Sequence, residues 1–251
     1  NNCSAFGLAA LSLCTTGGNN SAFGSKALNV CTVGTNNTAV GASGGLMLVN
    51  GNRNVIMGTN ALPACVDGNN NISIGVSSGL GLTTGNDNIF IGYESGKNIT
   101  NTGNNICLNH FGVAGDINTT RIGATTTART FIQGISGKTT AGTAVNVMID
   151  SNGQLGTVSS LRSLKEEIED VDEESNKIIV ENLRVRKFKM KEHEVRSYGL
   201  IVDEVEEEEL IARDNEGNAY TIRYDQIQFL LLKEIQRMNK EIEELKSRIN
   251  I

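Results

Sequence analysis

The first 108 residues repeat one pattern of apolar and polar positions every seventeen residues. Each copy reads Gly-x-x-Asn, then three small or apolar residues, then a second glycine, as in residues 51–58 and 68–75. The second glycine recurs at Gly7, Gly24, Gly41, Gly58, Gly75 and Gly92, and the asparagine at Asn20, Asn37, Asn54, Asn71, Asn88 and Asn105. A short β-branched run between Asn and Gly is typical of a strand flanked by tight corners. Because so short a unit cannot bury its apolar face alone, the pattern predicts stacked turns, a β-solenoid, over residues 1–111.

The pattern changes twice after the repeat. Residues 112–158 are rich in Thr and Gly and contain strand-like runs at 129–134 and 144–150, which predicts a β-rich neck. From residue 159 the sequence has the texture of an α+β domain, with strands expected at 178–190, 198–205 and 219–224. The fold class is therefore mainly β, followed by α+β.

The chain is expected to end in a coiled-coil helix over residues 225–251. Apolar residues alternate there in steps of four and three, with Glu and Lys between them. They are Leu231, Ile235, Met238, Ile242, Leu245 and Ile249. Such a seam joins copies of the chain, and its isoleucine content favours a trimer. The alternative is a single amphipathic helix that packs on its own domain.

Charge supports a boundary near residue 158. Residues 1–158 hold six Lys/Arg and five Asp/Glu, whereas residues 159–251 hold sixteen and twenty-three. The acidic balance argues against nucleic acid or an anionic membrane surface as partner. No run of eighteen apolar residues occurs, so we expect no membrane insertion. The small apolar residues and 4% aromatics predict a narrow core, to which three chains around an axis would add burial.

No cofactor or metal is expected. The two histidines, His110 and His193, have no Cys or carboxylate neighbour at ligand spacing. Cys14, Cys31 and Cys65 share a phase of the repeat that Leu48, Leu82 and Ile99 fill elsewhere. Stacked side chains there point the same way, which does not suit a disulfide, so we expect free thiols.

Two resemblances to known families follow from these motifs. The repeat over residues 1–108 resembles that of trimeric fibre and autotransporter-like heads, which implies a homotrimeric β-roll or β-prism. The junction at 153–168, with the segments 198–201 and 220–224, resembles the intramolecular chaperone auto-processing domain. That domain ends phage tailspikes, endosialidases and some virus fibres, and it also occurs in the myelin regulatory factor.

The second resemblance implies a self-cleaving serine peptidase over residues 159–251. Ser160 matches the nucleophile and Lys165 the general base, with cleavage between Ser159 and Ser160; Ser159 is the nucleophile if the register shifts by one. Leu161 stands where Asp or Ser is usual, and Ser163 where Arg is usual. Ser–Lys pairs are a recognised variant of serine hydrolase chemistry.

We therefore expect a homotrimeric fibre protein of a virion tail or a bacterial cell surface, whose C-terminal chaperone drives assembly and then releases itself. One alternative is a trimerisation cap that does not cleave. Another is an adhesin whose repeats bind a host-surface receptor or glycan. A membrane-released transcription factor is more remote, because residues 1–158 offer no basic face for DNA.

Overall fold

The computed structural model describes residues 2–136, 138, 140–191, 194–214 and 216–249. The chain divides into two compact units, Asn1–Gly137 and Lys138–Ile251.

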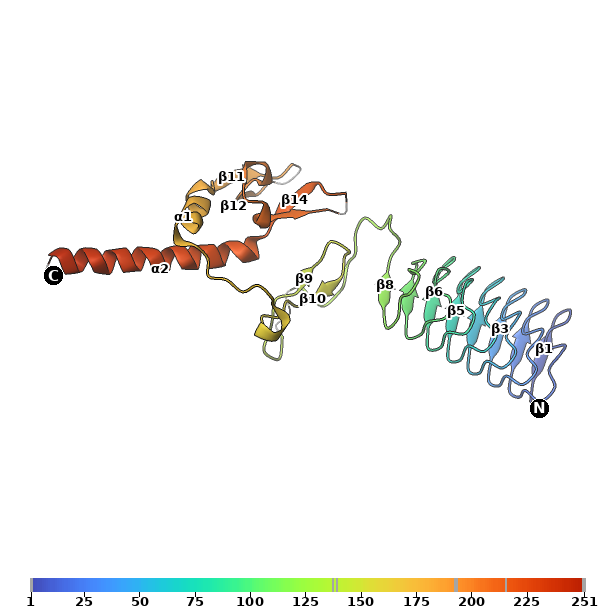
Figure 1. The fold of residues 1–251 in the computed structure, drawn as a ribbon. Coiled ribbons are helices and arrows are strands. Elements are labelled where there is room, and N and C mark those ends of the chain that lie inside the picture. Colours follow the sequence, from blue (N-terminus) through green and yellow to red (C-terminus); the bar gives the residue numbers. More distant parts are fainter. Residues whose placement is uncertain (1, 137, 139, 192–193, 215, 250–251) are drawn as a thin grey trace. The chain divides into compact units, whose positions relative to one another are not determined.

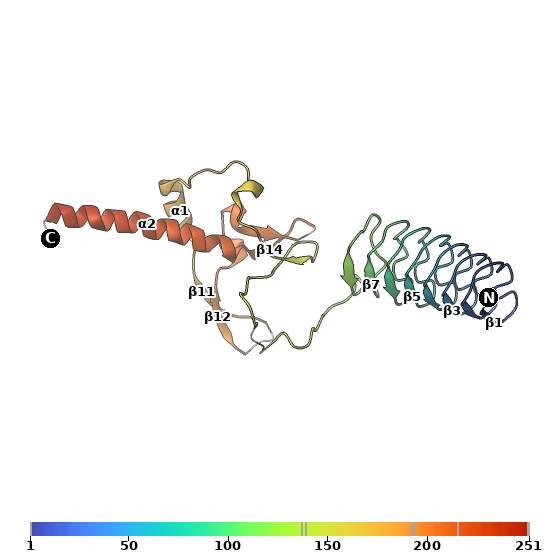
Figure 2. The same ribbon diagram turned by 90° about the horizontal axis from the view of Figure 1, so that it is seen from below.

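The first unit is a parallel β-solenoid, as the repeat predicts (Figures 1 and 2). Its one sheet has eight strands in chain order: β1 (Ser4–Phe6), β2 (Ser21–Phe23), β3 (Thr38–Val40), β4 (Val55–Met57), β5 (Ile72–Ile74), β6 (Ile89–Ile91), β7 (Ile106–Leu108) and β8 (Thr120–Ile122). Strands β1 to β7 pair seventeen residues apart, for example Ser21 with Thr38, whereas Ile106 pairs with Thr120. The ladder thus runs one strand beyond residue 111, where the repeat was expected to end.

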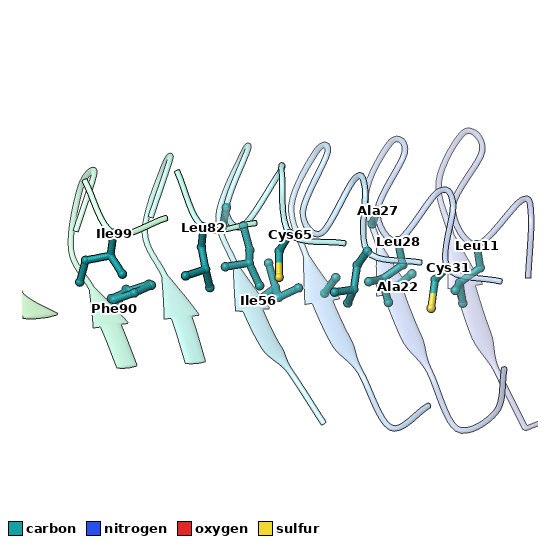
Figure 3. Close-up of a cluster of buried hydrophobic side chains, with 14 of the residues drawn as sticks. Leu11, Ala22, Ala27, Leu28, Cys31, Ile56, Cys65, Leu82, Phe90 and Ile99 are labelled. Carbon is teal, nitrogen blue, oxygen red and sulfur yellow. The ribbon is translucent and has the colours of Figure 1, made fainter. Parts of the chain in front are cut away.

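A column of apolar side chains fills the inside of the solenoid (Figure 3). The middle residue of the strand points inward, as do Ile56 and Phe90, both of which are fully buried. Leu82 and Ile99 meet this column from the opposite side of the turn, and Leu48, which fills the same slot of the repeat, is also fully buried. Because each turn contributes only a few such residues, no turn can bury its share without its neighbours.

Glycine is required at the strand ends by a close approach between turns. Gly24 has a φ of +136°, and a Cβ on it would lie 2.6 Å from the carbonyl oxygen of Gly41. A side chain would therefore meet both an unfavourable backbone conformation and the next turn.

A ladder of buried asparagines explains the second series of the repeat. The Oδ1 atom of Asn20 accepts hydrogen bonds from the backbone N–H and the Nδ2 of Asn37, at 2.9 and 3.1 Å. The Nδ2 of Asn37 also donates to the carbonyl oxygen of Gly51 at 2.7 Å. The same contacts continue from Asn37 to Asn105. Each side-chain amide therefore satisfies polar groups of the neighbouring turn as well as the backbone carbonyl at its own corner.

An ion pair closes the far end of the apolar column. Arg121 is the middle residue of β8, in register with the buried Cys107. Its Nε and Nη2 donate to the two carboxylate oxygens of Asp116 at 2.6 and 2.7 Å, and the Asp116 side chain is only 9% exposed. The backbone N–H of Val113 also donates to Asp116, at 2.8 Å. Arg121 occupies an inward position that is apolar in most other strands, and the bidentate pair with Asp116 compensates its charge there.

The second unit combines short hairpins with two α-helices. Its elements are β9 (Met148–Ile149), β10 (Leu155–Gly156), η1 (Arg162–Leu164), α1 (Glu173–Asn182), β11 (Arg186–Lys189), β12 (Arg196–Gly199), η2 (Val202–Glu204), η3 (Glu208–Leu210), β13 (Ile211–Arg213), β14 (Ala219–Ile222) and α2 (Tyr224–Ile249). The pairs β9–β10, β11–β12 and β13–β14 are antiparallel. The expected run at 129–134 forms no strand, although all its residues are described.

The strand expected at 178–190 is wrong in its first half. Residues up to 182 form α1, whose N-terminus is capped by Asp172, with its carboxylate accepting the N–H of Ser175 at 2.9 Å. The cap and two acidic residues in the first turn outweigh the β-branched run Ile178–Val180. The strand expected at 198–205 ends at Gly199, because Leu200, Val202 and Val205 pack instead on the buried Leu210 and Ile222.

Candidate functional site

The structure brings the two predicted catalytic residues together. The Nζ of Lys165 donates a hydrogen bond to the Oγ of Ser160 at 3.1 Å. The short helix η1 between them folds the chain back, with the N–H of Lys165 donating to the carbonyl oxygen of Arg162 at 3.1 Å. Ser159 lies beside them, and its Oγ accepts the N–H of Leu161 at 3.4 Å. The pair has the spacing that a nucleophile and its base require.

Both side chains of the pair are exposed in the single chain. A lysine that acts as base must give up its own proton first, and a drier environment favours this. The two leucines between Ser160 and Lys165 in the sequence are themselves open to solvent: Leu161 is 63% exposed and Leu164 68%. The single chain therefore supplies the contact between Ser160 and Lys165 but not the burial that a lysine base would need.

The apolar seam of α2 is open. Leu231, Ile235, Met238, Ile242, Leu245 and Ile249 are between 44% and 62% exposed. The neighbouring face of α2 is the one that packs on the rest of the unit. There the Nδ2 of Asn176 in α1 donates to the carbonyl oxygen of Leu230 at 3.2 Å, and Lys233 lies 3.9 Å from Glu173. α2 is therefore amphipathic in its own unit, packing through one face while the seam residues on the neighbouring face stay largely exposed, so the alternative of a single amphipathic helix remains open.

The helix register assigns the seam residues to heptad positions. Ile235, Ile242 and Ile249 fall at a positions, and Leu231, Met238 and Leu245 at d positions, since the step from d to a is four. Isoleucine at a with leucine at d favours two strands in parallel coiled coils. The seam therefore indicates self-association, but its isoleucines do not by themselves favour three chains.

A second open apolar surface covers the outside of the solenoid sheet. The first and third residues of each strand point outward, since the middle residue points inward. In β1 to β7 none of these fourteen outward residues is charged. Those that are large and exposed are Phe6, Phe23, Val40, Val55, Met57 and Ile91. This face was not among the predicted sites, although alternation within three-residue strands is a signal for it.

No protein-family model matches the chain, and no curated protein or solved structure matches it either. Both resemblances drawn from the motifs therefore stay predictions, and the case for a function rests on the chain's own geometry.

Neither a metal-binding cluster nor a membrane-spanning helix is found among the described residues. Among the described residues, no group of three or more His, Cys, Asp or Glu side chains is placed to hold a metal ion. His110 accepts the N–H of Gly112 through Nδ1 at 2.8 Å, whereas His193 lies outside the described residues. Within the described part of the chain, no helix has the length and apolar character needed to cross a membrane.

Proposed function

We propose that the chain is a homotrimeric fibre protein whose C-terminal part drives assembly and then releases itself by cleavage between Ser159 and Ser160. The observation that carries this proposal is the 3.1 Å contact between the Lys165 Nζ and the Ser160 Oγ. A protein of this kind belongs on a virion tail or a bacterial cell surface, and its partner in the first instance is itself.

The proposed chemistry begins with Ser160. Its Oγ attacks the carbonyl carbon of Ser159 while neutral Lys165 accepts the hydroxyl proton. Lys165 then returns this proton to the departing backbone nitrogen, which leaves Ser159 esterified to the Oγ of Ser160. Water hydrolyses the ester, so the products are a carboxylate on Ser159 and a free amine on Ser160. One water is consumed for each bond cut.

In this proposal, assembly of the chains comes before cleavage. The open seam of α2 raises the local concentration of the chains, and the outer sheet face then has partners to pack on. In the single chain the Ser–Lys pair is exposed, so cleavage waits for the burial that other copies provide. Release of the C-terminal part leaves a solenoid without its assembly device, and the stability of the product becomes kinetic.

The test is the intact mass of purified wild type, Ser160→Ala and Lys165→Ala, together with native mass. We expect wild type to give two fragments whose masses sum to the chain plus one water, and both variants to stay whole. Ser163→Ala is the matched control, because this neighbouring exposed serine has no role in the reaction and its variant should cleave like wild type. Cleavage of the Ser160→Ala variant at the same bond would contradict the proposed nucleophile.

The second candidate is a trimerisation cap that stays attached. The exposure of both Ser160 and Lys165 favours it, because an uncovered pair lacks the environment of an active base. A wild-type chain that remains whole and trimeric would support the cap over the peptidase. A whole chain that remains monomeric would exclude both.

A further inference from the structure

The first turn of the solenoid differs from all others in its buried corner. In the second turn, the Nδ2 of Asn20 and the Sγ of Cys31 both donate to the carbonyl oxygen of Gly34, at 2.7 and 3.7 Å. Cys3 stands seventeen residues before Asn20, in the slot of the asparagine ladder, and Cys14 stands seventeen residues before Cys31. The corner that holds an asparagine beside a Cys, Leu or Ile in the following turns therefore holds two thiols here.

These two thiols share one hydrogen-bond acceptor. The Sγ of Cys3 lies 3.6 Å and the Sγ of Cys14 3.4 Å from the carbonyl oxygen of Gly17. This is a different relation from that between Cys14 and Cys31, which occupy equivalent slots on successive turns and point the same way. Within one turn the two sulfurs reach the same carbonyl oxygen, so the side chains converge, as a disulfide requires.

The other cysteines are not available for this chemistry. Cys31, Cys65 and Cys107 are buried, whereas Cys3 and Cys14 are partly exposed. Burial also raises the pKa of the Cys31 and Cys65 thiols to about 11, so their reactive thiolates are scarce.

We propose that Cys3 and Cys14 form a disulfide that closes the first turn of the solenoid. A small disulfide such as oxidised glutathione is the oxidant. The thiolate of one cysteine attacks it, forms a mixed disulfide and releases one glutathione; the second cysteine then attacks the protein-side sulfur and releases the other. Two thiols lose two protons and two electrons, and one glutathione disulfide becomes two thiols. The bond ties strand β1 to the corner that follows it.

The test is to equilibrate the folded full chain with a mixture of oxidised and reduced glutathione at mildly alkaline pH. The chain is then unfolded in denaturant with N-ethylmaleimide, which blocks every free thiol, buried ones included, and its intact mass is measured. Burial is the main cause that raises the pKa of Cys14, so the reaction should accelerate as pH rises. Of the five cysteines, we expect three to be labelled, and peptide mapping to recover Cys3 joined to Cys14.

Two variants make the result specific. Cys3→Asn restores the ladder residue and Cys14→Leu restores the residue found at Leu48, so both should fold, lose the bond and label at all four remaining cysteines. Cys31→Leu changes the same slot one turn further on and should keep the bond. Labelling of all five cysteines in oxidised wild type, or a bond in wild type that joins any other pair, would overturn the proposal.

Discussion

At the scale of single residues, the buried asparagine is what fixes the period. Asn54 donates to Asn37 and to the carbonyl oxygen of Gly68, at 3.0 and 2.8 Å, and accepts two bonds from Asn71. An apolar residue of similar size would leave the N–H of Asn71 unsatisfied in a dry interior. The ladder is therefore both a source of stability and a reason why a shifted register is unfavourable.

Replacing Asn54 by Ala should destabilise the solenoid by about 3 kcal/mol, since it removes several buried hydrogen bonds and leaves a cavity. Thermal or denaturant unfolding of the two proteins measures the difference. Asn101→Ala is the matched control: Asn101 is exposed and outside the ladder, and its loss should change stability by less than about 0.5 kcal/mol. Equal effects of the two changes would mean that the ladder contributes nothing special.

Where the repeat is regular, the identity of single residues predicts their local structure well. Periodic glycines and asparagines predict short strands between tight corners, which the structure confirms, whereas the hydrogen-bonded ladder of buried asparagines was not predicted. The pair between Asp116 and Arg121 could not be predicted, because it forms where the step shortens and a charged residue enters an inward position. The Ser160–Lys165 contact follows the predicted spacing, whereas the exposure of both side chains could not be read from their spacing in the sequence.

At the scale of elements, strand and helix patterns predict type more reliably than extent. The terminal helix and the strand at 219–222 are confirmed, since their periodicity is long or their flanks are clear. The run Ile178–Val180 was assigned to a strand because β-branched residues favour strands in general. The residue that caps the helix, Asp172, lies six positions before this run, and its hydrogen bond at the N-terminus favours the helix over a strand.

The last turn of the solenoid should make its stability dependent on pH. The hydrogen bonds from the Arg121 guanidinium lower the pKa of Asp116 below its usual range. The folded state therefore binds the Asp116 proton more weakly than the unfolded state. The stabilisation is fully present above the unfolded pKa of about 4 and is lost as pH falls through the lower folded pKa.

Unfolding measured from about pH 6 down to about pH 2 checks this dependence. In Asp116→Asn the acid-induced loss should be smaller than in wild type, because the titrating group is gone, while stability at neutral pH is lower. Parallel pH profiles for the two proteins would show that the pair does not couple to folding.

At the scale of the whole molecule, two open apolar surfaces are the candidates for contacts between chains. The α2 seam and the outer sheet face together expose large side chains that a monomeric protein seldom leaves uncovered. The heptad assignment favours two helices, and the resemblance to fibre heads implies three chains. Stoichiometry is a property of all interfaces together, so no single helix can establish it.

The variant Ile242→Glu should raise the dissociation constant of the assembly at least ~100-fold, because it places a charge within the seam. Ser247→Glu adds the same residue on the same helix outside the seam and should leave assembly unchanged. Light scattering or native mass over a dilution series measures both. An Ile242→Glu protein that assembles like wild type would show that α2 does not join the chains.

The uniform register from β1 to β7 also bears on how such a protein changes over generations. Adding or removing one complete unit leaves each remaining turn with the same neighbours above and below, and alters the reach of the structure by about 4.8 Å. Gain or loss of a single residue would displace a ladder amide and a strand-end glycine together. Recombination between gene segments that encode whole units therefore offers a graded way to lengthen or shorten the protein, whereas small frame-preserving insertions within a unit are selected against.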